Sequence, residues 1–187
     1  MPIIIPISGK AESGKDFTAK LLKEELERQD QRVLIINYAD QLKFICSKYF
    51  GWNGEKDNIG RSLLQQIGTE KVRSKNNNFW VDNVIEFVKV FQDDYDYVII
   101  PDCRFANEIE RWNNNFEFVS LRVERFNYEN HLTPEQRLHS SETALDDYNF
   151  DYYIKSESGV DILKEKVIKF IERMNEWDNH LKEWNNV

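Results

Sequence analysis

The chain has 187 residues, 41% of them hydrophobic and 13% aromatic, which is enough apolar material for one domain with a sizeable core. Its formal net charge of −8 argues against a protein that coats DNA or RNA, because such proteins concentrate positive charge to neutralise phosphates. No run approaches the roughly 20 apolar residues that a membrane helix needs, and no secretory signal pattern is present. We therefore expect a single cytoplasmic domain over residues 1–187, with no nucleic acid polymer and no membrane as partner.

Short aliphatic or aromatic runs alternate along the chain with polar-faced stretches of helical spacing. This alternation predicts an α/β protein with a five-stranded, mainly parallel sheet flanked by helices. Pro6 and Pro101 stand at the carboxyl ends of two runs, where we expect the ladder hydrogen bonds to stop. The last long stretch has an apolar stripe that core packing explains. The expected strands cover residues 3–7, 33–36, 97–100, 118–123 and 152–154, and the expected last helix covers residues 160–184.

A glycine-rich motif directly follows the first expected strand and precedes a helical stretch. It reads Gly-Lys-Ala-Glu-Ser-Gly-Lys-Asp over residues 9–16 and matches the pattern G-x-x-x-x-G-K. Such glycines let successive backbone N–H groups wrap a phosphate at a helix N-terminus, and Lys15 would reach the β- and γ-phosphates of ATP. The alternative is a glycine-containing turn with a surface lysine. The predicted ATP phosphate-binding residues are Gly9, Lys10, Ser13, Gly14, Lys15, Asp16 and Phe17.

Asp16 stands where this motif normally carries a Ser or Thr that binds Mg²⁺. A carboxylate is also a hard oxygen ligand, so Asp16 could hold the ion directly or through water. The alternative role of Asp16 is that of an acidic residue in the first helical turn, which favours the positive end of the helix.

Three motifs in this order resemble bacteriophage deoxynucleoside monophosphate kinases. They are the Gly-Lys-Asp ending of the glycine-rich motif, the segment Asp-Cys-Arg-Phe-Ala-Asn-Glu at 102–108, and His-Ser-Ser-Glu at 139–142. The resemblance covers most of the chain, and the segments 38–43 and 64–80 look like the acceptor side of that family. It implies a P-loop kinase fold, ATP with Mg²⁺, and a deoxynucleotide acceptor. It also implies that the protein supplies precursors for phage DNA synthesis in the host cytoplasm.

A monophosphate acceptor attacks through an oxygen that is already anionic, so this reaction needs charge neutralisation and alignment rather than a general base. Asp102 closes the third expected strand and Arg104 follows it, which places a metal-side carboxylate and a phosphate-binding guanidinium at the carboxyl edge of the sheet. The candidate Mg²⁺ ligands are therefore Asp16 and Asp102. A solvated Asp and Arg at an ordinary turn remain the alternative.

The acceptor is expected to bind within residues 38–95. Arg61 and Arg73 flank a helical stretch, where Gln65 offers an amide that could read a base edge, and Trp80 could offer a face for stacking or simply pack in the core. The candidate acceptor-binding residues are Asp40, Lys43, Arg61, Gln65, Arg73, Trp80, Arg104, Glu108 and Glu142.

Residues 124–142 are basic and polar, and we expect them to form a mobile lid that closes over the phosphates. Arg125 and Arg137 are the preferred lid arginines, Glu142 could anchor one of them, and His139 is expected to make a structural hydrogen bond. An ordinary solvated loop is the alternative. The candidate catalytic residues are Lys15, Asp16, Asp102, Arg104, Arg125 and Arg137.

Two other functions remain open from the sequence. Some phosphomevalonate kinases also have a P-loop that ends in Gly-Lys-Asp and a similar strand-end Asp and Arg, so the acceptor could be a phosphorylated isoprenoid acid. A nucleotide-hydrolysing switch module is the other alternative. The preferred base, the need for deoxyribose and the choice between monomer and homodimer also stay open.

Overall fold

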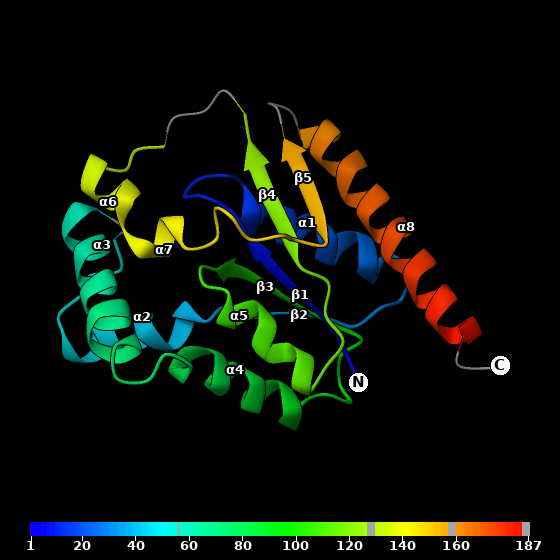
Figure 1. Ribbon diagram of the computed structural model, residues 1–187, viewed down its shortest axis with the longest axis horizontal. Coiled ribbons are helices and arrows are strands. Elements are labelled where there is room, and N and C mark those ends of the chain that lie inside the picture. Colours follow the sequence, from blue (N-terminus) through cyan, green and yellow to red (C-terminus); the bar gives the residue numbers. More distant parts are fainter. Residues whose placement is uncertain (56, 127–129, 157–159, 185–187) are drawn as a thin grey trace.

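The computed structural model describes residues 1–55, 57–126, 130–156 and 160–184, which form a central sheet with helices around it (Figure 1). The strands are β1 (Ile3–Ser8), β2 (Val33–Ile35), β3 (Tyr97–Cys103), β4 (Leu121–Arg125) and β5 (Tyr152–Ser156). The helices are α1 (Lys15–Glu27), α2 (Ala39–Tyr49), α3 (Asn58–Gln65), α4 (Phe79–Val90), α5 (Asn107–Glu110), α6 (Pro134–Leu138), α7 (Ser140–Thr143) and α8 (Val160–Trp184). A π-helical segment, Gln66–Arg73, continues α3 directly and is called the π segment below, and a short 3₁₀ helix, Arg111–Asn114, follows α5.

The sheet has the strand order β2-β3-β1-β4-β5, and every pair of neighbours is parallel. This confirms the predicted α/β class and the five-stranded sheet, which proves to be wholly parallel. The aliphatic runs form these strands because helices cover both faces of a parallel sheet, so its strands need apolar side chains on both sides.

The two prolines lie inside strands, which corrects the prediction that they end them. Pro6 is paired with Ile100, and the next pair is Ser8 with Cys103, so two residues of β3, Pro101 and Asp102, stand opposite one residue of β1. Proline is tolerated at such an irregularity because ladder hydrogen bonds are locally interrupted there. The same irregularity lies at Asp102, a candidate site residue.

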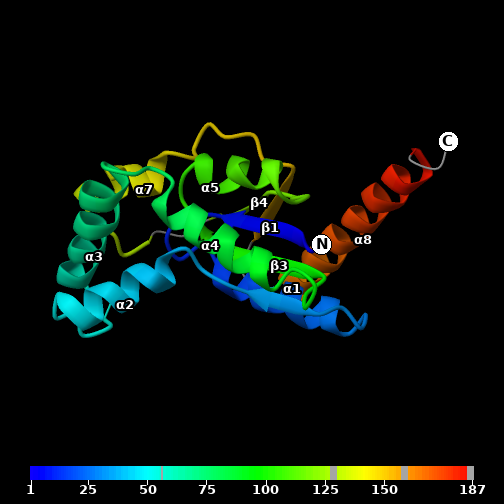
Figure 2. The ribbon, with the colours of Figure 1, turned by 90° about the horizontal axis from the view of Figure 1, so that it is seen from below.

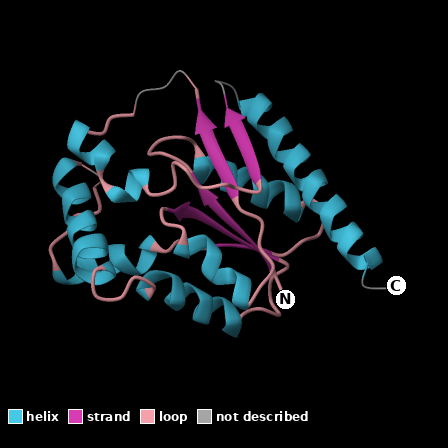
Figure 3. Cartoon of the chain, in the orientation of Figure 1, coloured by secondary structure: helices cyan, strands magenta, loops and turns pink. Residues whose placement is uncertain are grey.

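Two helical layers bury the sheet. On one face α1 and α8 pack against Ile5, Ile7 and Leu121, and on the other face α4 and α5 pack against Ile4 and Ile100 (Figures 1 and 3). The predicted stripe of the last helix is confirmed at Leu163, Val167, Ile171 and Met174, which are buried, while the side chain of Leu181 lies outside the described residues.

A group of helices lies to one side of the sheet, at the carboxyl ends of β1 and β3. It contains α2, α3, α6 and α7, and two views at right angles place α2, α3 and α7 together, far from the end of α8 (Figures 1 and 2). Open parallel sheets bind ligands beyond the carboxyl ends of their strands, so this group of helices marks the place to look for a site. Among the described helices, none is both long and apolar enough to cross a membrane.

Candidate active site

The glycine-rich motif, residues 9–16, connects β1 to α1, as predicted, and is called the phosphate loop below after its predicted ligand. Gly14 has a φ of 93°, which a residue with a side chain adopts only at a cost. At Gly9, a Cβ atom would lie 2.3 Å from Ser13 Oγ and 2.6 Å from the carbonyl oxygen of Val123, so no side chain fits there. Both glycines are therefore required by the shape of the loop.

The loop contains a buried hydroxyl and a buried ammonium group with few partners. Ser13 Oγ is buried, and it makes no hydrogen bond within the described part of the chain. Lys15 is 7% exposed, and among the described residues its Nζ has a single, long hydrogen bond of 3.4 Å to the carbonyl oxygen of Lys10. Burial, followed by the nearby Arg104 guanidinium, lowers the pKa of Lys15 to about 8. The loop thus presents polar groups that an anionic ligand could satisfy.

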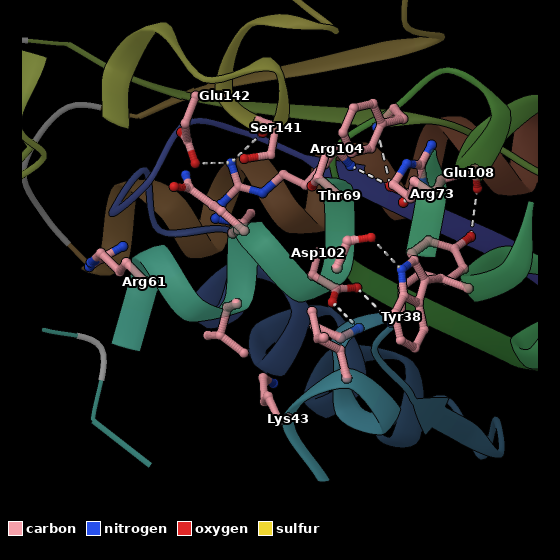
Figure 4. Close-up of a pocket in the computed structure, with 18 of the residues that line it drawn as sticks. Tyr38, Lys43, Arg61, Thr69, Arg73, Asp102, Arg104, Glu108, Ser141 and Glu142 are labelled. Atoms are coloured by element: carbon pink, nitrogen blue, oxygen red, sulfur yellow. Dashed lines mark hydrogen bonds and ion pairs between the residues drawn. The ribbon is translucent and has the colours of Figure 1, made fainter. Parts of the chain in front are cut away.

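A cavity of about 230 Å³ opens beside Lys15 and Asp16 (Figure 4). Its walls come from the first turn of α1, the first half of α2, the α3 helix with the π segment, the loop after β3, and the region around α7. Asp16 is exposed, and its carboxylate makes no hydrogen bond or ion pair with a described residue. The carboxylate is free to meet a cation.

Glu142 joins the phosphate loop to the loop after β3. Its carboxylate pairs with Arg104 Nη1 at 2.7 Å and accepts the N–H of Ala11 at 3.0 Å, although only 8% of the side chain is exposed. Glu142 therefore anchors Arg104 rather than one of the expected lid arginines (Figure 4). Lys10 points toward the same region, where its Nζ donates to the carbonyl oxygen of Glu142 at 2.6 Å and pairs with Asp146.

Asp102 lines the cavity at the carboxyl end of β3 and also holds the start of α2. Its two carboxylate oxygens accept the backbone N–H groups of Tyr38 at 3.0 Å and Ala39 at 2.9 Å (Figure 4). Burial raises the pKa of Asp102, and these two hydrogen bonds oppose the rise. Asp102 thereby fixes the helix that carries the α2 wall of the cavity.

Arg73 is a buried cation at the end of the cavity formed by the π segment. It pairs with Glu108 at 2.8 Å, donates to Asn77 and Asn107, and stacks 3.7 Å from the centre of the Phe105 ring. Burial raises the pKa of Glu108 and lowers the pKa of Arg73, whereas their mutual attraction opposes both shifts. This network holds the guanidinium in one orientation.

Trp80 forms part of the cavity wall but belongs to the core. It is 5% exposed, its Nε1 donates to the carbonyl oxygen of Gly68 at 3.1 Å, and its ring meets Phe79 edge to face. The packing alternative for Trp80 thus describes its environment, and little of the indole face is available for stacking on a ligand.

The structure brings most of the predicted site residues to the cavity, but not all of them. Asp40 lies outside and pairs with Lys43 at 2.9 Å. Arg125 is exposed at the end of β4, and Arg137 on α6 is exposed and donates to the carbonyl oxygen of Asn130. Phe17 lies in the first turn of α1, is 43% exposed and does not line the cavity. The predicted residues that line the cavity are Lys15, Asp16, Lys43, Arg61, Gln65, Arg73, Trp80, Asp102, Arg104, Glu108 and Glu142.

The expected lid contains α6 and α7, and residues 127–129 within it lie outside the described residues. Thr133 and Gln136 cap the start of α6 reciprocally, which explains why a helix begins there. His139 caps α7 by accepting the N–H of Ser141 at 3.2 Å, and this confirms the structural hydrogen bond predicted for it. From this region, Leu132, Ser141 and Glu142 reach the cavity.

Several cavity residues carried no sequence signal as single residues. Thr69 lies four residues after Gln65, and Phe105 directly follows Arg104. Helical spacing could have pointed to Thr69, whereas Phe105 becomes visible only through its stacking on Arg73.

Comparison with known proteins finds solved structures with a similar fold. The chain is 16% identical to shikimate kinase from Bacteroides thetaiotaomicron, with a TM-score of 0.55 and coverage of 92% of this chain and 98% of that chain. Thymidylate kinase from Ehrlichia chaffeensis is 12% identical with a TM-score of 0.51, and the alignment covers 91% of this chain and 98% of that one. The APS kinase of Mycobacterium tuberculosis, solved as a cysteine mutant, is 12% identical with a TM-score of 0.52, covering 91% and 97% of the two chains.

These similarities establish the P-loop kinase fold, and no curated protein sequence matches the chain. The family model described as phosphomevalonate kinase matches residues 7–118, which is more than half of the chain and includes the phosphate loop, α2, α3, the π segment and the end of β3. With its P-loop, its strand-end Asp102 and Arg104 and its wholly parallel sheet, the chain belongs to the phosphomevalonate kinase family of P-loop kinases.

Proposed function

We propose that the protein transfers the γ-phosphoryl group of ATP to the phosphate of a nucleoside monophosphate, with a deoxynucleotide as acceptor, to give ADP and a nucleoside diphosphate. One observation carries the proposal: a single cavity begins at Lys15 of the phosphate loop and continues between α2 and the π segment, where apolar and neutral polar groups line it and its cations already have acidic partners. In the setting implied by the phage resemblance, this reaction would supply precursors for DNA synthesis in a bacterial cytoplasm.

The ATP phosphates would occupy the loop between β1 and α1. A phosphate chain would satisfy the buried ammonium group of Lys15 and the Ser13 hydroxyl, which has no hydrogen-bond partner among the described residues, and the left-handed Gly14 shapes the loop around it. Binding of the anion would also raise the pKa of Lys15, which burial lowers to about 8.

The acidic residues of the site suit Mg²⁺ as the ion that accompanies ATP. Asp16 offers a free carboxylate, whereas both oxygens of Asp102 already accept an N–H, so Asp102 would contribute through its remaining lone pairs or through water. When bound, the ion would neutralise phosphate charge.

In the transfer step, an anionic oxygen of the acceptor phosphate forms a bond to the γ-phosphorus, the bond from this phosphorus to the β–γ bridging oxygen breaks, and ADP leaves with the electron pair. No proton needs to be removed from the nucleophile, so the site requires cations rather than a base. Lys15 and Arg104 line the cavity at its junction with the phosphate loop and would share the charge of the phosphoryl group as it moves.

Three cations on the acceptor side already have acidic partners. Lys43 pairs with Asp40, Arg73 with Glu108, and Arg61 lies 3.9 Å from Glu12 of the phosphate loop. A phosphorylated isoprenoid acid carries a carboxylate besides its phosphate and would need a second available cation. A nucleoside needs neutral hydrogen-bonding groups and apolar contact, which Gln65, Leu42 and Leu64 supply.

Phosphomevalonate is the second candidate acceptor, because the matching family is described by that name. The same ATP side and the same transfer step would serve it, and Lys43 would have to leave Asp40 to meet its carboxylate. The two candidate acceptors would thus share the ATP side of the site and differ only in the contacts that they make with the acceptor side of the cavity.

The region around α6 and α7 would act as the lid. Leu132, Ser141 and Glu142 already reach the cavity, and closure would bring Arg125 or Arg137 toward the phosphates and exclude water. Exclusion of water matters because an unprotected γ-phosphoryl group would be lost to hydrolysis rather than transferred.

The test is ADP release from ATP and Mg²⁺ with each deoxy- and ribonucleoside monophosphate, with phosphomevalonate, and with no acceptor, using mass spectrometry to identify the product. We expect release that depends on one or a few deoxynucleoside monophosphates. Activity with phosphomevalonate alone would replace the acceptor and keep the kinase, and equal release without any acceptor would favour a hydrolysing switch. Lys15→Met protein serves as the inactive control.

A further inference from the structure

Four polar side chains follow one another at four-residue spacing along the cavity wall formed by α3 and the π segment: Arg61, Gln65, Thr69 and Arg73. An α-helix has about 3.6 residues per turn and a π-helix is wider, so a spacing of four keeps side chains near one face across the junction. The π geometry is visible in the hydrogen bond from the N–H of Ser74 to the carbonyl oxygen of Thr69, at 3.2 Å. The row therefore faces the cavity along its whole length.

The ends and the middle of this row differ in charge and in occupancy. Both ends are arginines with acidic neighbours, Glu12 for Arg61 and Glu108 for Arg73. The two middle groups are neutral and half-buried, and within the described part of the chain neither the Gln65 amide nor the Thr69 hydroxyl makes a side-chain hydrogen bond. Polar side chains in a partly buried position normally have partners, so these two are available to a ligand.

The remaining wall beside the middle of the row gives little polar recognition. Leu42 is apolar, and the N–H of Trp80 is already taken by the carbonyl oxygen of Gly68. Gly68 keeps this wall close to α2, because a Cβ there would lie 2.6 Å from Leu42 Cδ2. A planar ring that lies against these apolar groups would meet hydrogen-bonding groups only at its edge.

We propose that Thr69 is a specificity-determining residue and that it reads the edge of the acceptor base together with Gln65; this inference rests on the proposed nucleoside monophosphate kinase function. An amide offers a carbonyl acceptor and two N–H donors, and a hydroxyl offers a donor and an acceptor. Neighbouring donors and acceptors are what distinguish one base edge from another, whereas a phosphorylated alkyl acid has no such edge. The four-residue spacing lets the two side chains contact adjacent atoms of one ring.

The experiment measures kcat/KM for all four deoxynucleoside monophosphates with the wild-type protein and with Thr69→Val, Thr69→Ser and Gln65→Leu. Valine keeps the shape of threonine without its hydroxyl, and serine keeps the hydroxyl. For the preferred nucleotide we expect kcat/KM to fall about 10- to 100-fold in Thr69→Val and Gln65→Leu, since a site built to hydrogen-bond its substrate is left with an unpaired group. The loss for the other bases is smaller, so the selectivity ratio, which is kcat/KM for the preferred nucleotide divided by kcat/KM for another, falls in these two variants. Thr69→Ser retains most of the wild-type selectivity ratio.

Two controls separate this inference from the proposed function. Gln29→Leu changes an exposed glutamine near the end of α1, far from the row, and should leave both rate and selectivity unchanged. If the wild-type protein prefers one deoxynucleotide and Thr69→Val has the same ratio of kcat/KM between that nucleotide and the others, Thr69 does not recognise the base. The proposed kinase activity would still stand. A wild-type protein that accepts no nucleoside monophosphate overturns both. A lost ratio in Thr69→Val that Thr69→Ser does not restore also overturns the role of the hydroxyl.

Discussion

Replacement of Lys15 by methionine should stabilise the protein while it removes activity. Lys15 is 7% exposed, and burial together with the Arg104 guanidinium lowers its pKa from 10.5 to about 8. A pKa difference of 1 corresponds to about 1.4 kcal/mol, so at neutral pH burial of the Lys15 charge costs at most about 3 kcal/mol. The weak bond to Lys10 and the remaining solvent contact reduce the expected gain in the free energy of unfolding to about 2 kcal/mol. For a chain of this size, that gain raises Tm by about 5 °C.

The assay is thermal unfolding followed by circular dichroism, without nucleotide, for wild type, Lys15→Met and Lys20→Met. Lys20 is exposed on the same helix, so its replacement should change the free energy of unfolding by less than about 0.5 kcal/mol. Between about pH 8 and 10.5 the folded wild-type protein binds fewer protons than the unfolded chain, so its stability rises with pH relative to Lys15→Met. The advantage of the variant should therefore shrink across this range.

Saturating ATP should reverse the order, because only the wild type gains stability by binding it, by about 2.7 kcal/mol at 100 times Kd. A Lys15→Met protein that is less stable than wild type without nucleotide would refute the description of Lys15 as a strained buried charge. Retained phosphoryl transfer in this variant would refute its role in the phosphate loop.

Three further substitutions test the network around the cavity. Arg104→Lys keeps the charge but loses the fork of donors, and we expect single-turnover transfer to slow by about 100-fold or more; a change of less than about 3-fold would exclude Arg104 from the transfer step. Glu108→Gln leaves the buried Arg73 without its acidic partner and should lower the free energy of unfolding in urea by about 3 kcal/mol, so an unchanged midpoint would contradict the pairing. Asp102→Asn leaves one oxygen where two accept N–H groups, and hydrogen exchange at the Tyr38 amide should accelerate about 10-fold, whereas unchanged protection would show that the carboxylate does not hold α2.

Local patterns in the sequence were sufficient for the fold class and for the position of the glycine-rich loop. Five aliphatic runs mark the strands because both faces of a parallel sheet exclude water. Each strand therefore needs consecutive apolar residues, which can be recognised in the sequence. The phosphate loop is equally local: the glycines, Ser13 and Lys15 lie within one turn between a strand and a helix. The stripe of α8 is visible for the same reason, since helical periodicity is a property of neighbouring residues.

The acceptor side depended on contacts between distant segments. Arg104 meets Glu142 across 37 intervening residues, and Lys10 turns to the same region and away from its own loop. Asp40 seemed a binding residue by its position in a motif, yet it lies outside the cavity and its carboxylate pairs with Lys43.

Pro6 and Pro101 show how strand register, rather than residue type, decides where a side chain points. The irregular pairing that accommodates them sets two residues of β3 opposite one of β1 at Asp102, and no local pattern announces such a mismatch. The sequence by itself thus determined where the strands and the glycine-rich loop form, because those features follow from short-range periodicity and turn chemistry. The tertiary structure alone decided which charges are neutralised by partners and which polar groups, such as Thr69 and Gln65, make no side-chain hydrogen bond within the described residues, because pairing depends on distances between elements far apart in the chain.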